Sequence, residues 1–282
     1  MQIFKEIAPL KAFLVEKRRL GQTVGFVPTM GALHEGHLSL IQASKRDNPI
    51  TISSIFVNPA QFNNPADLEK YPRTPDMDIA MMEKVGCDAL FFPDNGVMYE
   101  SESTVRFDFG NLERVMEGKF RPGHFSGVAL VVSKLFHIVE PDYAYFGQKD
   151  WQQFAIIRQL VHELKFNVKL KSVPTLREPD GLAMSSRNMR LTKTQRKKAV
   201  LLYQSLMQAS DMLKNGSAIA AVKLKVHQML DKDPEIKLEY FEVADSENLK
   251  LLNSVEEAVS PILCTAAFIG DVRLIDNMFL SR

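Results

Sequence analysis

The pattern of apolar and polar positions changes sharply within residues 23–41, and the change predicts a strand, a tight turn and a helix. Residues 23–27 are rich in valine and phenylalanine, as buried strands are, and a proline and Gly31 interrupt the run. Apolar residues return at helical spacing from Leu38 to Ile41. In an open parallel sheet such a turn lies at the carboxyl end of a strand, where ligands bind, and the new helix presents unpaired backbone N–H groups that suit phosphate.

Strand and helix patterns alternate in this way through the first part of the chain. Apolar runs predict strands at 50–57, 88–92, 143–146 and 167–173, with a short outer strand at 105–109. Helical spacing predicts helices at 9–20, 76–85 and 126–140, and another that begins near residue 154. Asp76 and Asp78, in the first turn of their helix, would complement its dipole. The alternation predicts an α/β fold, a Rossmann-like doubly wound parallel sheet.

The pattern changes again after residue 175. A segment rich in turn formers and basic residues comes first, and two predicted helices follow at 192–214 and 217–230. Alternating apolar residues then predict strands at 237–243, 262–269 and 272–275. We therefore expect two domains, a Rossmann-like ligand-binding domain over 1–175 and a smaller α+β domain over 176–282.

Two histidines distinguish the turn near Gly31 from an ordinary loop. His34 and His37 flank Glu35 and Gly36, so a helix starting near Gly36 would place one ring in its first turn and the other just before it. Such an imidazole could donate a hydrogen bond to charge that develops on a phosphate. The pair could instead be a polar helix cap, or bind zinc, although H-E-G-H lacks the zincin spacing and catalytic zinc needs a third protein ligand. The preceding Pro-Thr-Met-Gly favours a nucleotide site.

Polar groups also follow other predicted strands. Asn58 and Gln61 come after the strand at 50–57, where the same ligand pocket is expected. Lys149 follows a glycine after the strand at 143–146, where a lysine can neutralise phosphate, although an ordinary surface lysine would give the same pattern. Ser185, Ser186 and Arg187 would suit a clamp over phosphates, and a surface hairpin with a helix cap is the alternative.

Composition narrows the class of protein. The 35 Lys and Arg against 34 Asp and Glu give a net charge of +1, which provides no global field that would attract nucleic acid or an anionic membrane. No segment reaches the ~20 apolar residues of a membrane span, and the N-terminus lacks the apolar region of a signal peptide. Cys87 and Cys264 are far apart with no C-x-x-C spacing, and predict neither a disulfide framework nor a metal site. We expect a protein of the reducing cytoplasm.

Seven blocks of sequence, in a fixed order from residue 28 to 277, together resemble one family. They are P-T-M-G-A-L-H-E-G-H-L-S-L, F-V-N-P-A-Q-F, Y-P-R-T, R-P-G-H-F-S-G-V, F-G-Q-K-D-W-Q-Q, R-E-P-D-G-L-A-M-S-S-R-N and R-L-I-D-N. The chain resembles the pantothenate synthetases, which join pantoate to β-alanine with ATP. Their superfamily includes class I aminoacyl-tRNA synthetases, in which an H-x-G-H turn and a K-M-S-K-S-type loop hold ATP. Arg187 departs from the usual lysine of that loop, and Gln148 from the glutamate of many family members.

The resemblance implies a site, residue by residue. The catalytic residues would be His37, His34 and Lys149. ATP would lie along Met30, Gly31, Ala32, Leu33, His34, Glu35, Gly36, His37, Gly147, Gln148, Lys149, Asp150, Leu176, Met184, Ser185, Ser186 and Arg187. Gln61 would bind pantoate and β-alanine, and Gln153 would bind pantoate. Arg121 and His124 would lie near the active site or a subunit contact, and the Met184–Arg187 loop would be a lid carried by the second domain.

The resemblance also implies an activity. Pantoate would attack the α-phosphorus of ATP to give pantoyl adenylate and pyrophosphate, and the amine of β-alanine would then release AMP and pantothenate, a coenzyme A precursor. Mg²⁺ would accompany the ATP, held mostly by phosphates and water, and no protein ligand for the metal is identified. A cytoplasmic homodimer without nucleic-acid or membrane partners is expected.

Other functions share parts of this pattern. A nucleotidyltransferase that joins AMP or CMP to a phosphorylated acceptor also has an H-x-G-H turn, but would want further basic residues, whereas the two glutamines suit a carboxylate and hydroxyls. A non-catalytic nucleotide sensor could keep the fold. A role in charging tRNA is disfavoured, because an anticodon-binding extension and a net basic charge are lacking.

Overall fold

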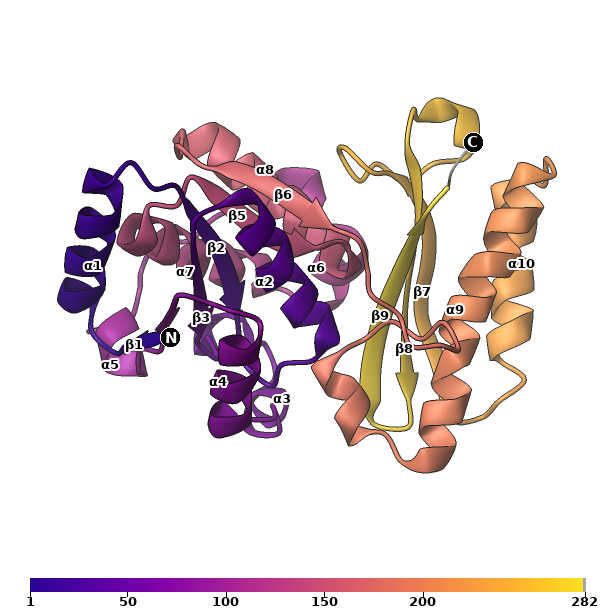
Figure 1. Ribbon diagram of the computed structural model, residues 1–282. Coiled ribbons are helices and arrows are strands. Elements are labelled where there is room, and N and C mark those ends of the chain that lie inside the picture. The colour runs from indigo at the N-terminus through magenta and orange to yellow at the C-terminus, as the bar shows by residue number, and fades with distance from the viewer. Residues whose placement is uncertain (281–282) are drawn as a thin grey trace. The chain divides into compact units, whose positions relative to one another are not determined.

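The computed structural model describes residues 1–280, and contacts within the chain group them into two compact units (Figure 1). The N-terminal unit comprises Met1–Phe109, Arg121–Gln148 and Ile156–Pro174. The C-terminal unit comprises Gly110–Phe120, Lys149–Ala155 and the chain from Thr175 onwards. Two short segments that precede residue 175 therefore belong, by their contacts, with the C-terminal unit. The domain division at residue 175 and the lid stay predictions.

A parallel sheet forms the centre of the N-terminal unit, as predicted, and it has six strands. Its strands in spatial order are β1 (Gln2–Phe4), β4 (Ala89–Phe91), β3 (Ile50–Ile55), β2 (Val24–Thr29), β5 (Tyr143–Gly147) and β6 (Lys169–Val173). Every neighbouring pair runs parallel. All six residues of β3 are buried, which explains its nearly continuous run of apolar and small residues.

Helices cover both faces of this sheet. They are α1 (Ile7–Arg19), α2 (Glu35–Asp47), α3 (Pro65–Glu69), α4 (Pro75–Lys84), α5 (Asn95–Met98), α7 (His124–Val139) and α8 (Trp151–Leu164). Right-handed crossovers that lead from β2 to β3 and on to β4 put α2 and α4 on one face, and the return to β5 puts α7 on the other. The packing of α2 on α4, and of α1 on α7, agrees with this (Figure 1).

One polar contact ties the far end of α2 to the sheet. The Tyr145 hydroxyl of β5 donates to the Asp47 carboxylate and accepts from the Asn48 amide, both at 2.8 Å. The surrounding core is apolar, with Ile41 and Met82 fully buried. Because buried polar groups need partners, this contact fixes how α2 lies on β5.

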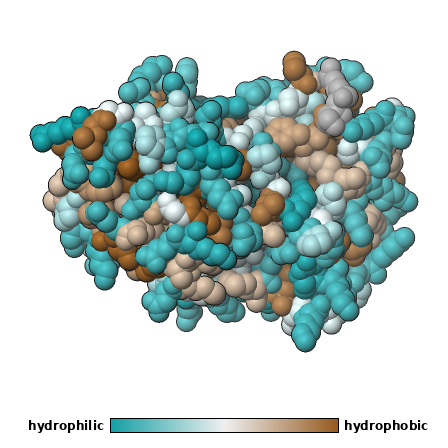
Figure 2. Space-filling model, in the orientation of Figure 1, coloured by the Kyte–Doolittle hydropathy of each residue, from teal (hydrophilic) through white to brown (hydrophobic). Residues whose placement is uncertain are grey.

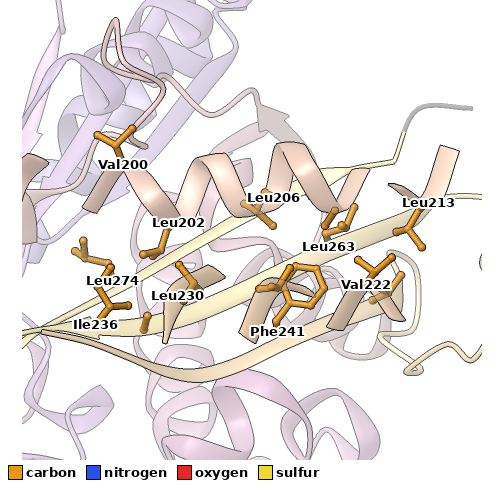
Figure 3. Packing of buried hydrophobic residues seen from close by; sticks show 14 of the residues in the cluster. Val200, Leu202, Leu206, Leu213, Val222, Leu230, Ile236, Phe241, Leu263 and Leu274 are labelled. Carbon is orange, nitrogen blue, oxygen red and sulfur yellow. The ribbon is translucent and has the colours of Figure 1, made fainter. Parts of the chain in front are cut away.

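The C-terminal unit is an α+β layer, as predicted. Its antiparallel sheet contains β7 (Ile236–Asp245), β8 (Pro261–Ile269) and β9 (Val272–Phe279) in that order, and α9 (Lys193–Lys214) and α10 (Ile219–Leu230) pack on it. Figure 3 shows Leu206 and Leu213 of α9 and Val222 of α10 directed towards Phe241 and Leu263 of the sheet. Inward residues at helical and at alternating spacing therefore share one core.

A buried ion pair attaches the 110–120 segment to this sheet. Glu117 lies in the short helix α6 (Met116–Phe120) and is 6% exposed. Its two carboxylate oxygens accept from the Arg273 guanidinium at 2.6 and 2.8 Å, and one accepts from the Tyr240 hydroxyl at 2.9 Å. Burial raises the pKa of Tyr240, so the hydroxyl keeps its proton and stays a donor.

Two local expectations differ from the structure. Residues 105–109 form no strand, because the Phe107 N–H donates to the Ser126 hydroxyl rather than to a neighbouring strand. Conversely, β1 at the N-terminus pairs with β4, although three residues are too few to show a period. Among residues 1–280 no helix is both long enough and apolar enough to cross a membrane. Figure 2 shows hydrophilic residues over much of the visible face, with hydrophobic residues scattered among them.

Close packing of α7 yields a stability prediction. Gly127 faces the 3-10 turn η1 (Pro59–Gln61), and a Cβ there would lie 2.1 Å from the Ala60 carbonyl oxygen. We expect Gly127→Ala to lower the free energy of unfolding by about 1–3 kcal/mol, because overpacking outweighs the higher helix propensity of alanine. Urea denaturation measures this. Gly147→Ala is the control, since a Cβ there would have no neighbour within 4 Å; equal stability of the two variants would contradict the packing.

Candidate active site

The strand order reverses between β2 and β5, and in an open α/β sheet such a reversal predicts a ligand site at the carboxyl ends of the two strands. The chain moves outward from β2 through β3 to β4, then returns to β5 on the other side of β2. Open α/β sheets bind ligands at such a switch point, because the loops after the two strands leave in opposite directions. Both predicted junctions begin here: Met30 follows β2, and Gly147 ends β5 two residues before Lys149.

A buried carboxylate shapes the turn after β2. Gly31 and Ala32 have left-handed backbone conformations, with φ of 79° and 50°. The N–H groups of Ala32 and Leu33 donate to the two Asp78 carboxylate oxygens, each at 2.8 Å, and the Thr74 hydroxyl donates to the same group at 3.1 Å. Asp78 is 1% exposed, so these donors replace water around its charge. The sequence suggested for Asp78 only an interaction with the helix dipole.

The two histidines cap α2 through their Nδ1 atoms. His34 is the N-cap, and its Nδ1 accepts from the Gly36 N–H at 3.1 Å. The Nδ1 of His37 accepts from the His34 N–H at 3.3 Å, and the ring centroids are 4.1 Å apart. A neutral imidazole whose Nδ1 accepts carries its proton on Nε2. The cap and the nucleotide site are therefore compatible, because the cap orients both rings with Nε2 as the donor.

A second turn holds Gln61 beside the turn over Met30–His37, which we call the histidine turn. Asn58 donates through its amide to the Gln61 side-chain oxygen and to the Gly127 carbonyl, both at 3.1 Å, and accepts from the Tyr99 hydroxyl at 2.7 Å. The Gln61 amide is in turn 3.0 Å from the Met30 sulfur. Gln61, predicted for pantoate, therefore touches a residue predicted for ATP.

His124 supports this turn from α7. Its Nδ1 donates to the main-chain oxygen of Gln61 at 2.7 Å, and the ring is 5% exposed. The main-chain oxygen of Arg121 accepts from the His124 N–H at 3.1 Å. Of these two residues, His124 is thus in direct contact with a predicted substrate residue.

Cavities of different size lie in the N-terminal unit. One of about 300 Å³ is lined by Met30, Gly31 and Asp78 among others, so it opens beside the histidine turn. A larger one of about 720 Å³ is lined by residues that include Phe62 and Tyr99 and by no predicted site residue. Of these two cavities, the smaller one is therefore the one that predicted site residues line.

Lys149, Asp150 and Gln153 lie in the C-terminal unit. Lys149 and Asp150 are in the 3-10 turn η3 (Gln148–Asp150), with 3.8 Å between ammonium and carboxylate. Gln153 is partly exposed in the first turn of α8. Its neighbour Gln152 is buried and structural, because its amide donates at 2.7 and 2.9 Å to main-chain oxygens of the 110–120 segment.

The segment from Leu176 to Arg187 is a hairpin followed by a helical turn. The Met184 N–H donates to the Leu176 carbonyl at 3.0 Å, so two predicted ATP residues are adjacent. Ser185 caps the 3-10 helix η4 (Ser186–Arg190), and its hydroxyl accepts from the Arg187 N–H at 3.3 Å. The sequence allowed either a hairpin with a helix cap or a clamp over phosphates. The structure contains the hairpin and the helix cap, and the phosphate clamp stays a prediction.

The structure thus groups the predicted residues within each unit. In the N-terminal unit, Met30–His37, Gln61 and Gly147–Gln148 stand at the switch point. In the C-terminal unit, Leu176 meets Met184. Sequence reasoning missed Asp78 as the partner of the histidine turn, and it noted Asn58 without finding its bond to Gln61. Both lie inside the resembling region, but a hydrogen bond between distant segments leaves no periodic signal.

Known proteins of one family match this chain along nearly its whole length. The family model described as Pantoate-beta-alanine ligase matches residues 2–279. The pantothenate synthetase of Cytophaga hutchinsonii is 45% identical over 275 residues, which cover 97% of both chains. That of Porphyromonas gingivalis is 46% identical over 278 residues, which cover 99% of both.

Solved structures are similar as well. The crystal structure of pantothenate synthetase from Thermus thermophilus superposes with a TM-score of 0.94 at 39% identity, covering 100% of both chains. Pantoate-beta-alanine ligase from Francisella tularensis, complexed with beta-gamma ATP and beta-alanine, gives 0.82 at 38% identity, covering 99% of this chain and 98% of the other. With its fold, its histidine turn and these full-length matches, the chain belongs to the pantoate–β-alanine ligase family.

Proposed function

We propose that this protein joins pantoate to β-alanine with ATP, giving pantothenate, AMP and pyrophosphate through pantoyl adenylate. The observation that carries the proposal is the histidine turn at the switch point, with a buried glutamine touching it, in a chain that belongs to this ligase family. Attack of one anion on another needs its charges neutralised and its reactants aligned, and little covalent help from the protein.

In the first half-reaction the carboxylate oxygen of pantoate bonds to the α-phosphorus, and pyrophosphate leaves. The Nε2–H groups of His34 and His37 would donate to phosphate oxygens, where negative charge grows in the transition state. Lys149 and Arg187 would add positive charge. The amides of Gln61 and Gln153 would orient pantoate without adding a charge that opposes its own.

In the second half-reaction the amine of β-alanine attacks the acyl carbon of the adenylate, AMP leaves, and the amine gives up a proton. Pantoyl adenylate is open to hydrolysis, so water must be excluded while the amine enters. We propose the hairpin and turn that carry Met184–Arg187 as the lid that excludes it, moving with a domain over 176–282. Gln61 would also hold β-alanine.

Magnesium is proposed to accompany the ATP. Among residues 1–280, no three His, Cys, Asp or Glu side chains gather as a metal site. Mg²⁺ commonly keeps water and binds mainly to substrate phosphates in nucleotide sites, so the proposal assigns it no protein ligand. The ion would supply charge neutralisation at the triphosphate.

The assembly and the compartment are also proposals. The homodimer comes from the family resemblance, and the reducing cytoplasm from the two cysteines, whose spacing predicts no disulfide framework. The balanced charge of the chain, +1, agrees with a protein whose partners are small molecules rather than nucleic acid.

Exchange of labelled pyrophosphate into ATP tests the function. We expect exchange only when pantoate is present, because adenylate formation is reversible and needs the acid. Addition of β-alanine should consume the adenylate, so that AMP is released in a net reaction. Exchange driven by a phosphorylated acceptor instead of pantoate would identify a nucleotidyltransferase and contradict the proposal.

Substitutions at His37 test whether its Nε2–H group donates to the phosphates during the reaction. We expect His37→Ala and His37→Asn to lower turnover roughly 100-fold or more, as loss of a charge-stabilising donor does. Asparagine can keep the acceptor that caps α2, so its loss of activity would report Nε2 rather than folding. His37→Gln, which can place an amide N–H near the Nε2 position, should retain more activity than His37→Asn.

The matched control for this series is His227→Ala, an exposed histidine on α10. Its turnover should equal that of the wild type. A fully active His37→Asn enzyme would remove His37 from the catalytic residues, and a protein that binds ATP but never turns over would be a nucleotide sensor.

A further inference from the structure

The R-L-I-D-N string at residues 273–277 of β9 has no role in the chemistry proposed above. Two of its residues, Asp276 and Asn277, are 4% and 6% exposed, although both are polar. Each bonds to a segment that carries predicted ATP residues. Buried polar groups at such points need an explanation, because burial costs free energy unless a partner is present.

Asn277 holds the main chain of Lys149. Its amide donates to the Lys149 carbonyl oxygen at 2.7 Å. Lys149 lies in η3, a 3-10 turn of three residues, where few regular hydrogen bonds fix the backbone. The side chain of Lys149 is 18% exposed, so it is largely enclosed. Fixing this carbonyl fixes the peptide plane and with it the direction in which the lysine side chain leaves.

Asp276 holds the hairpin through Arg177. The two guanidinium nitrogens donate to its two carboxylate oxygens at 2.6 and 3.0 Å, a bidentate pair. Arg177 follows Leu176 directly and is bridged to Ala183, the residue before Met184. Burial raises the pKa of Asp276, and the charges of Arg177 and, more weakly, Lys149 oppose that rise. The Asp276 carboxylate therefore interacts with both cations.

Stability alone does not account for this arrangement. A buried ion pair recovers little more than its own desolvation cost, and well-packed apolar residues of the same volume often serve stability as well or better. A bidentate pair and a directed amide do specify position, which apolar packing does less sharply. Asp276 and Asn277, which make these two contacts, are consecutive residues of β9.

We propose that Asp276 and Asn277 are positioning residues of the ATP site. Asn277 sets the direction of the Lys149 ammonium, and Asp276 sets the hairpin at Leu176 through Arg177. The inference rests on the proposed function, because it assigns these residues to adenylate formation. Aminolysis of the finished adenylate by β-alanine does not depend on Asn277, because no triphosphate then remains for Lys149 to neutralise.

The test compares the two half-reactions in Asn277→Ala and Asn277→Leu proteins. We expect pantoate-dependent pyrophosphate exchange to fall roughly 10- to 100-fold, the cost of a misplaced group. Aminolysis of preformed pantoyl adenylate should change by less than about twofold. In a Lys149→Ala background, the Asn277 substitutions should lower exchange by less than about twofold further, because residues that act as a unit are not additive.

Thr265→Val is the matched control. Thr265 is fully buried in the same sheet, and its hydroxyl donates at 3.2 Å to the main-chain oxygen of Tyr240. Tyr240 is not a predicted site residue. It should lose stability in urea and keep its rate of exchange. Asn277→Leu retains side-chain volume, so it keeps the test informative if the alanine variant folds poorly.

Three results would overturn the inference: exchange at the wild-type rate in both Asn277 variants, an equal further loss when Lys149 is already alanine, or an equal loss in Thr265→Val. Failure of the proposed function has a different signature. In that case the wild-type protein itself would show no pantoate-dependent exchange.

Discussion

The reversal of strand order between β2 and β5 is the constraint on which the rest of the site depends. Parallel strands need crossovers, which are right-handed. The chain builds β2, β3 and β4 in one direction, and because β1 already lies beyond β4, the next strand, β5, is added on the other side of β2. The loops after β2 and β5 then diverge at one edge. The N-terminus of α2 and the η1 turn after β3 stand at that edge, and the polar residues follow from this placement.

Within each unit, loops that carry predicted site residues are held by buried polar groups rather than by regular secondary structure. Asp78 binds the backbone of the histidine turn, Asn58 binds Gln61, and Asn277 binds the backbone of Lys149. Catalysis by charge stabilisation requires donors that are in position before charge develops, because reorganisation during reaction would cost the energy gained. In each unit, directed hydrogen bonds hold the segments that carry predicted site residues, which is what the proposed catalytic role requires.

Local periodicity explains why the elements could be predicted and the supporting contacts could not. The apolar runs of β2 and β3 and the spacing of Leu38 and Ile41 are local signals, and they gave the sheet and α2 correctly. The 105–109 segment alternates apolar and polar residues as a strand can, but its Phe107 N–H bonds to a serine hydroxyl instead of a strand. Asp78 is 45 residues from Leu33, and Asn277 is 128 from Lys149, so their bonds depend on the folded chain. The individual site roles came from motif resemblance.

A crystal structure with a non-hydrolysable ATP analogue and pantoate tests the central claim most directly. The account predicts one triphosphate with phosphate oxygens within about 2.7–3.2 Å of both His37 Nε2 and Lys149 Nζ. It also predicts the pantoate carboxylate facing the α-phosphorus, with pantoate held by Gln61. A nucleotide bound away from the carboxyl ends of β2 and β5, or bound there without either cation or imidazole in contact, would contradict it.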